Sequence, residues 1–195
     1  MSSSPTYSAV LLAAGRSARM GRDKALLDCG GAPLWRRQWR VLEQAGAGEI
    51  FLSARPDQAW VPPGVTTLAD AVPGAGPLAG IAAALARCQT SHLLVLAVDL
   101  PHMPPAWFAQ LAATCTPGRG AVGRRGKFFE PLAAIYPCEL RAAAEAALGR
   151  GDFALQAFIA AAADRMIVHD ITDAAAPWFE NWNEPAERSG NADPR

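Results

Sequence analysis

The sequence carries no excess charge of either sign, since 18 lysines and arginines stand against 18 aspartates and glutamates. This balance argues against a general nucleic-acid or membrane-surface binder, because such proteins usually carry a basic excess. Long apolar runs are also missing, and none reaches the roughly 20 residues of a membrane-spanning helix. We therefore expect a cytoplasmic protein that binds neither nucleic acid nor membrane.

Closely spaced cysteines are absent as well. The four cysteines are far apart and form no C-x-x-C pair, which argues against a zinc site or a disulfide framework. We interpret all four as reduced structural thiols: Cys29, Cys88, Cys115 and Cys138.

The apolar stretch near the N-terminus mimics a signal peptide, but it is only about a strand long and no basic segment precedes it. The 195 residues, 51% of them apolar, suffice for one well-packed core. We expect a flexible N-terminus over residues 1–6, a single domain over 7–187 and a flexible tail over 188–195.

The first half of the chain alternates between apolar strands and helical patterns. The expected elements are strands at 9–12, 49–54, 65–69 and 92–98, and helices starting at Pro33, Pro77 and Pro104-Pro105. Such alternation predicts an α/β fold of the Rossmann-like type, with a mostly parallel sheet between two helical layers. In the helix after Pro33 we expect Trp35 and Trp39 to be core residues.

The second half is less regular. Strands are expected at 120–123, 128–136 and 166–171, and Pro131 argues that the second of these is an edge strand or contains a bulge. Helices are expected over 137–148, ended by Gly149, and over 153–163, with Phe153 and Phe158 on one face.

A loop of small residues follows the first strand and carries four basic side chains. Small residues allow a ligand to approach the backbone, so that N–H groups can face phosphate oxygens. The loop is neither a G-x-x-x-x-G-K-[ST] P-loop nor a G-x-G-x-x-G dinucleotide motif. Its basic residues would supply charge to a polyphosphate: Arg16, Arg19, Arg22 and Lys24.

Two further features follow strands that should end at the same edge of the sheet. Asp70 precedes a Gly/Pro turn that leads into a helix, and Asp99 follows the most apolar strand. Ligands of open α/β sheets bind at this edge. We expect Asp99 to hold Mg²⁺ through one carboxylate, with phosphate oxygens and water completing the octahedron.

Together these segments resemble the molybdenum cofactor guanylyltransferase family, over about residues 8–187. The segments that carry the resemblance are Leu12–Leu27 with its preceding strand, Gly76-Pro77-Leu78-Ala79-Gly80, Asp99-Leu100-Pro101, Glu130-Pro131-Leu132 and Asn181-Trp182-Asn183-Glu184-Pro185. The resemblance implies transfer of GMP from MgGTP to molybdopterin with release of pyrophosphate. It also implies Mg²⁺, with Mn²⁺ as an alternative, and protein partners that supply or receive the cofactor.

The resemblance also implies residue roles. Lys24, Asp99 and Arg19 would be catalytic, Asp99 would bind the metal, and Asn181 and Asn183 would lie on the acceptor side. The nucleotide would contact Leu12, Ala13, Ala14, Gly15, Lys24, Ser53, Asp70, Pro77, Leu78 and Asp99.

Two departures leave alternatives open. The family usually has Leu-Ala-Gly-Gly, whereas Leu12-Ala13-Ala14-Gly15 is more typical of cytidylyltransferases. It also often has Asn where this chain has Ser53, which weakens a nucleotide contact there. A cytidylyltransferase acting on molybdopterin, a nucleotidyltransferase acting on a sugar or isoprenoid phosphate, and a non-catalytic nucleotide-binding partner remain alternatives.

Overall fold

The computed structural model describes residues 7–15, 23–69, 72 and 74–182. Its strands are β1 (Tyr7–Leu12), β2 (Glu49–Ser53), β3 (Thr67–Leu68), β4 (His92–Ala97), β5 (Gly120–Arg125), β6 (Phe128–Pro137) and β7 (Met166–Asp170). Its α-helices are α1 (Leu34–Gln44), α2 (Pro77–Arg87), α3 (Pro105–Ala112), α4 (Arg141–Arg150) and α5 (Leu155–Ala161). Short 3-10 helices are η1 (Lys24–Leu26), η2 (Cys138–Leu140) and η3 (Ala176–Phe179).

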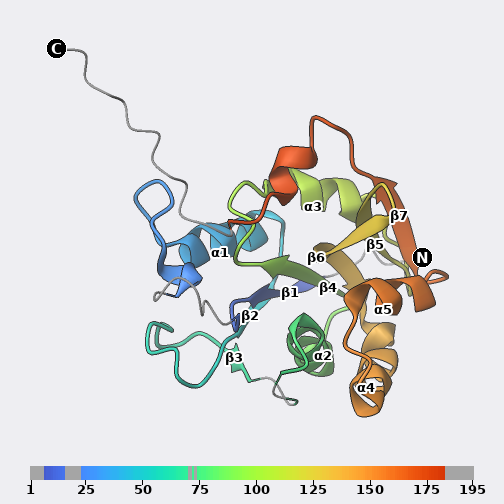
Figure 1. Cartoon of the computed structure of the whole chain (residues 1–195), viewed down its shortest axis with the longest axis horizontal. Helices are drawn as coiled ribbons and strands as arrows, with labels where there is room; N and C mark the ends of the chain where they lie inside the picture. The colour runs from blue at the N-terminus through green and yellow to red at the C-terminus, as the bar shows by residue number, and fades with distance from the viewer. Residues whose placement is uncertain (1–6, 16–22, 70–71, 73, 183–195) are drawn as a thin grey trace.

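All seven described strands form one sheet in the order β3-β2-β1-β4-β6-β5-β7. Only β6 runs antiparallel to its neighbours, β4 and β5. Helices α1 and α3 cover one face of the sheet, and α2, α4 and α5 cover the other (Figure 1). The α/β fold with a mostly parallel sheet between two helical layers is therefore confirmed.

The centre of the sheet follows directly from the sequence. All six residues of β4 are buried, and β1 pairs with it in parallel from Tyr7↔His92 to Leu12↔Ala97. An apolar strand without alternation suits a position covered on both faces. As a result, β1 and β4 end side by side, which places the segments after Leu12 and Ala97 next to each other.

Pro131 lies within the interior strand β6, so the edge-strand alternative is wrong and the bulge alternative is confirmed. The β5–β6 register shifts there, from Ala121↔Ile135 to Gly123↔Glu130. A bulge tolerates proline because its residues leave the regular hydrogen-bond ladder. The buried hydroxyl of Tyr136 donates to the carbonyl oxygen of Pro131 at 2.8 Å, which satisfies this interrupted backbone.

Three expectations about helices are corrected. The buried face of α1 consists of Leu34, Gln38, Val41 and Leu42, so Trp35 and Trp39 are only half-buried at its margin. Helix α4 continues through Gly149 and ends before Gly151, whose φ of 78° provides the left-handed cap. Helix α5 starts at Leu155, and Phe153 is 38% exposed outside it.

Within the described ranges, no helix is long and apolar enough to cross a membrane.

Gly80 sets how closely α2 packs on the sheet. A Cβ at this position would lie 2.7 Å from Ser53 Oγ and 2.8 Å from Leu12 Cδ2. A side chain at residue 80 would therefore force Ser53 and Leu12, or α2 itself, to shift.

We predict that Gly80→Ala destabilises the fold by about 1–3 kcal/mol, as expected for overpacking in a dense core. Gly149→Ala is the matched control, because a Cβ there meets nothing within 4 Å and the residue lies inside α4. That control should gain about 0.5–1 kcal/mol, since alanine favours helix over glycine. Urea unfolding of both variants measures these changes, and equal effects would contradict the packing role of Gly80.

Candidate functional site

The carboxyl ends of β1, β2 and β4 meet at one edge of the sheet. After β1, the N–H of Ala13 donates to the carbonyl oxygen of Ser53 at 2.8 Å. On the other side, the N–H of Val98 donates to the carbonyl oxygen of Leu12 at 3.0 Å. The small-residue loop and the segment leading to Asp99 are thus fixed beside each other.

Lys24 and Asp99 face each other across this edge, with Lys24 Nζ 4.0 Å from Asp99 Oδ2. Lys24 starts η1, and Asp99 lies two residues after the end of β4. Burial raises the pKa of Asp99, and the charge of Lys24 opposes that rise without cancelling it. The ionised Asp99 carboxylate is therefore under-solvated, and a bound cation would stabilise it.

The loop carbonyl groups are held by side chains from the segment after β2. Gln58 Nε2 donates to the carbonyl oxygen of Ala13 at 2.9 Å. Arg55 Nη1 donates to those of Ala14 and Gly15 at 2.9 and 2.8 Å. With these oxygens taken, the N–H groups of Ala14 and Gly15 are the backbone groups that this described part of the loop can offer to a ligand.

Asp23 connects the same segment to Lys24. Its Oδ2 accepts hydrogen bonds from Trp60 Nε1 at 2.7 Å and from Gln58 Nε2 at 2.5 Å. Its Oδ1 accepts the N–H of Ala25 at 3.1 Å and so caps η1. Arg55 Nη2 lies 4.0 Å from the carboxylate. This hydrogen-bonded cluster positions the start of η1, from which Lys24 extends.

Sequence analysis gave no role to Arg55, Gln58 and Trp60, which fall between or at the ends of the strands expected at 49–54 and 65–69. Asp23 was included only within the Leu12–Leu27 segment that carries the resemblance. No spacing in the sequence links residue 23 to residues 32 to 37 positions later, so only the fold reveals this cluster.

The segment after Asp99 is held from two sides. From α1, Gln38 Nε2 donates to the carbonyl oxygen of Leu100, and Arg37 Nε to that of Pro101 at 2.9 Å. From the far end of the chain, the N–H of Trp182 donates to the carbonyl oxygen of Asp99 at 2.9 Å. Asn181, expected on the acceptor side, directly precedes Trp182, whose backbone contacts Asp99.

Residues at the turn before α2 differ in their exposure. Gly76 has a φ of 67° and Pro77 is exposed at the start of the helix, whereas Leu78 is fully buried in the core. Ser53 is only 2% exposed, and its Oγ lies against Gly80. A ligand at this turn would meet Pro77 and backbone groups before it met the side chains of Leu78 or Ser53.

Several residues expected in the site lie outside the described residues. These are Arg19, Asp70 and Asn183, together with Arg16 and Arg22 of the basic loop.

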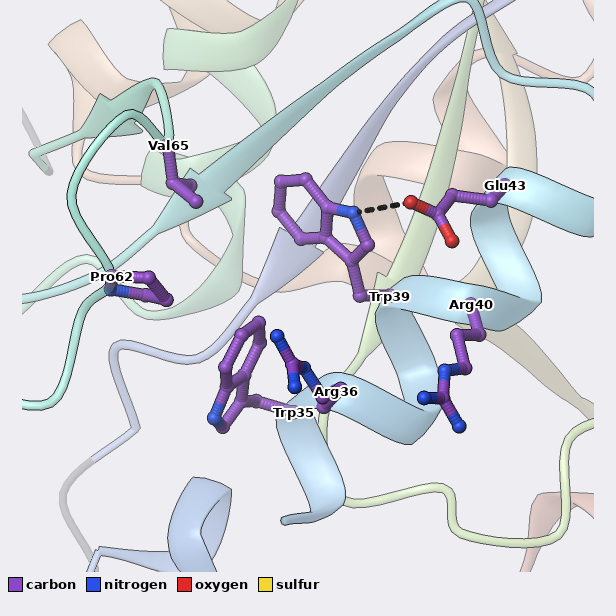
Figure 2. Close-up of a pocket in the computed structure, with 7 residues that line it drawn as sticks. All are labelled: Trp35, Arg36, Trp39, Arg40, Glu43, Pro62 and Val65. Atoms are coloured by element: carbon purple, nitrogen blue, oxygen red, sulfur yellow. Dashed lines mark hydrogen bonds between the residues drawn. The ribbon is translucent and has the colours of Figure 1, made fainter. Parts of the chain in front are cut away.

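Two hollows flank the segment after β2. The smaller, about 280 Å³, lies at the ends of β2 and β3 and is lined by Ala54, Arg55, Pro56, Gln58, Val61, Thr67 and Ala69. The larger, about 400 Å³, lies between α1 and Pro62–Val65 (Figure 2). Trp35 and Trp39 point into the larger one, where Trp39 Nε1 donates to Glu43 at 3.0 Å. The smaller hollow is lined by Arg55 and Gln58, which also hydrogen-bond the loop after β1. It is therefore the hollow that adjoins the candidate site.

Two of the described histidines, the buried His92 and the partly buried His169, have their rings engaged in hydrogen bonds. His92 bonds Ser91 Oγ and the carbonyl oxygen of Arg119, and His169 bonds Thr114 Oγ1. Across the described ranges, no three His, Cys, Asp or Glu side chains gather to hold a metal.

Comparison with protein families identifies this arrangement. The model of the MobA-like NTP transferase domain matches residues 9–166, which is more than half of the chain. The chain belongs to this family. The loop after β1, Lys24, α2 and Asp99 all fall within the matched range, whereas Asn181 and Trp182 lie beyond it.

A relative from Opitutus terrae is 43% identical over 183 residues, 91% of each chain, and is named a probable molybdenum cofactor guanylyltransferase. A relative from Pseudomonas fluorescens, named a molybdenum cofactor guanylyltransferase, is 36% identical over 149 residues, 74% of each chain. The MobA-like chain is therefore a nucleotidyltransferase by family.

Solved structures agree on the fold. The molybdopterin-guanine dinucleotide biosynthesis protein A of Archaeoglobus fulgidus has a TM-score of 0.70 at 21% identity, covering 91% of this chain and 93% of its own. A 2-C-methyl-D-erythritol 4-phosphate cytidylyltransferase from Thermus thermophilus has a TM-score of 0.62 at 20% identity, covering 90% and 91%. The MobA-like fold is thus shared by proteins named for different nucleotides.

We predict that Gln58→Ala weakens NTP binding at least several-fold while the protein stays folded. The variant loses hydrogen bonds to Ala13 and Asp23, so the loop and Lys24 are no longer held in a binding geometry. Calorimetric titration with a non-hydrolysable NTP measures the change. Gln110→Ala, on the exposed face of α3, is the control, and an equal affinity in both variants would contradict the positioning role.

Proposed function

We propose that this protein transfers GMP from MgGTP to molybdopterin, releasing pyrophosphate and forming the guanine dinucleotide form of the cofactor. The observation that carries the proposal is the 43% identity, over 91% of both chains, to a probable molybdenum cofactor guanylyltransferase. We also propose a cytoplasmic location and protein partners that supply or receive the cofactor.

In this proposal, GTP lies along the edge where β1, β2 and β4 end. Leu12, Ala13, Ala14 and Gly15 border the nucleotide, and Lys24, with Arg19, neutralises charge on the phosphates. The proximity of Lys24 to Asp99 and the bonded loop carbonyls support this placement. The base would lie towards Ser53, Asp70 and the start of α2, at Pro77 and Leu78, as the resemblance implies.

The residues present suit a divalent cation. Asp99 is a carboxylate whose burial disfavours its ionised form, and Lys24 only partly offsets this effect. One carboxylate with phosphate oxygens and water is the ligand set that Mg²⁺ adopts in nucleotide sites, and Mn²⁺ accepts similar ligands. When bound there, Mg²⁺ would neutralise charge that develops on the triphosphate.

The transfer step needs little covalent work from the protein. An oxygen of the molybdopterin phosphate attacks the α-phosphorus of GTP, the bond to the β-phosphate oxygen breaks, and pyrophosphate leaves. The acceptor phosphate is already ionised, so no general base is required. The protein positions the two reactants in line and stabilises the leaving charge through Lys24. Asn181 and Asn183 would hold the acceptor beside Asp99, as the Trp182–Asp99 hydrogen bond suggests for Asn181.

We predict that Asp99→Asn abolishes transfer and raises thermal stability at a pH where Asp99 of the wild type is ionised. In the wild type, burial raises the folded-state pKa of Asp99 above its unfolded value. Ionisation therefore costs stability, and this loss grows as pH rises through the interval between the two pKa values. Asparagine stays neutral, so its advantage should vanish at acidic pH, where Asp99 is protonated.

Calorimetric melting from pH 3 to pH 8 tests the stability part, in which each 1 kcal/mol corresponds to about 2–4 °C. Pyrophosphate release tests the catalytic part. Asp164→Asn, on an exposed turn before β7, is the control for both. Full transfer by Asp99→Asn at limiting Mg²⁺ would exclude Asp99 as a metal ligand.

We predict a guanine dinucleotide product when GTP and CTP compete in equal amounts with molybdopterin and Mg²⁺. The Ala14 methyl group replaces only a hydrogen and changes no hydrogen-bonding group of the loop. A site whose polar groups match guanine leaves them unpaired with cytosine, and such mismatches can discriminate by about 10⁴-fold. Mass spectrometry identifies the dinucleotide, and pyrophosphate release follows the reaction.

Three outcomes are informative. A cytidine product would favour the cytidylyltransferase alternative while leaving the fold and phosphate site unchanged. Pyrophosphate release only with a sugar or isoprenoid phosphate would replace the acceptor. GTP binding without any release would indicate a non-catalytic nucleotide-binding protein.

A further inference from the structure

Two cysteines that are far apart in sequence meet at the edge of the sheet opposite the nucleotide site. Cys88 caps the C-terminus of α2, and Cys138 begins η2 directly after β6. Their Sγ atoms are 2.8 Å apart across 50 residues of chain, and both residues are free thiols. Each is only partly buried, so small solutes can approach the pair.

Backbone hydrogen bonds hold both residues in place. The N–H of Cys88 donates to the carbonyl oxygen of Ala84 at 2.9 Å, which completes the last turn of α2. The N–H of Cys138 donates to the carbonyl oxygen of Ser91 at 3.0 Å, next to the β4–β6 pair His92↔Pro137. The contact between the sulfur atoms is therefore built into the packing of α2 beside β4 and β6.

The surroundings give the two sulfur atoms different roles. The Cys138 thiol donates its proton towards Cys88 Sγ, and Thr90 Oγ1 lies 3.1 Å from the same sulfur. These hydrogen bonds lower the pKa of Cys88 to about 6, against the opposing effect of burial. The same hydrogen bond raises the pKa of Cys138, because its proton is held between the two sulfur atoms. The contact thus favours the thiolate form of Cys88 and the thiol form of Cys138.

The other described cysteines lack this arrangement. Burial raises the pKa of Cys115 to about 12, and its Sγ donates to the carbonyl oxygen of Leu111. Thiolates rather than thiols react with peroxides, so oxidation should select Cys88 over Cys115.

We propose that Cys88 and Cys138 form a modification site, at which a hydroperoxide oxidises Cys88 and Cys138 resolves the product to a reversible disulfide. The Cys88 sulfur attacks one peroxide oxygen, the O–O bond breaks, and the other oxygen leaves with a proton as water or an alcohol. Cys138 then attacks the Cys88 sulfenic acid, so that the S–S bond forms and water leaves with the Cys138 proton. Two thiols are oxidised in total and one peroxide is reduced. A dithiol reverses the reaction.

The test uses the reduced full chain, hydrogen peroxide as the probe, and alkylation of the remaining thiols. The protein should lose two of its four thiols and about 2 Da of mass, and recover both with dithiothreitol. Tryptic digestion without reductant should yield peptide 88–119 linked to peptide 128–141. Because the first peptide also contains Cys115, the experiment is repeated in a Cys115→Ala background, where the link should persist.

Single variants separate the two roles. Cys88→Ser should block the cross-link and leave Cys138 a thiol. Cys138→Ser keeps a hydroxyl donor beside Cys88 but cannot form the disulfide, so the Cys88 sulfenic acid should accumulate and be trapped by dimedone. Cys29→Ser, which changes a partly buried cysteine outside the pair, should cross-link as the wild type does.

Circular dichroism before oxidation establishes that each variant is folded. The proposal is overturned if the folded wild type shows no 88–138 link, if peroxide oxidises Cys115 as fast as Cys88, or if the only disulfide joins two chains. None of these results bears on nucleotidyl transfer, because the pair lies at the opposite edge of the sheet and the proposal does not rest on the proposed function.

Discussion

The candidate site depends on the hydrogen bonds that the Asp23 carboxylate accepts. This carboxylate is a negative charge one residue from a lysine that we propose meets phosphates, a position where repulsion would be expected. Its oxygens are instead taken up by Trp60, Gln58 and the N–H of Ala25, with Arg55 nearby. Several donors disperse the charge, so Asp23 acts as a positioning residue rather than as a repulsive one. The same donors reach the loop carbonyls, so one cluster sets both the loop backbone and Lys24.

Asp99 shows the opposite use of a carboxylate. Few protein groups compensate it, since Lys24 lies 4.0 Å away and burial raises its pKa. A fold optimised only for stability would place a neutral residue there. An under-solvated acid just after the most buried strand lowers the stability of the fold, and a bound cation would remove this cost. The burial of Asp99 therefore supports a metal role more strongly than an exposed carboxylate would. The two acids thus differ because several protein donors satisfy the oxygens of Asp23, whereas burial leaves the Asp99 carboxylate under-solvated.

Much of the fold could be predicted because its central signals are local. The apolar strands β1 and β4, and the prolines that begin α2 and α3, are legible in short stretches of sequence. The second half was harder, because there the outcome depends on tertiary contacts. Pro131 sits inside the sheet only because a bulge and the Tyr136 hydroxyl accommodate it. Gly149 stays helical because Gly151, two residues later, supplies the left-handed cap.

The family motif includes Lys24 and Asp99, which the structure brings to 4.0 Å of each other, while their roles stay predictions. It could not reveal Arg55, Gln58 or Trp60, because their side chains act on backbone groups of a distant loop, and any suitable donor would serve. The thiol pair escaped for the same reason: cysteines 50 residues apart look unrelated until β4 and β6 pair. Motifs record residues that touch a ligand of fixed chemistry. Residues that position other residues are fixed by geometry, and only the assembled sheet shows which of them meet.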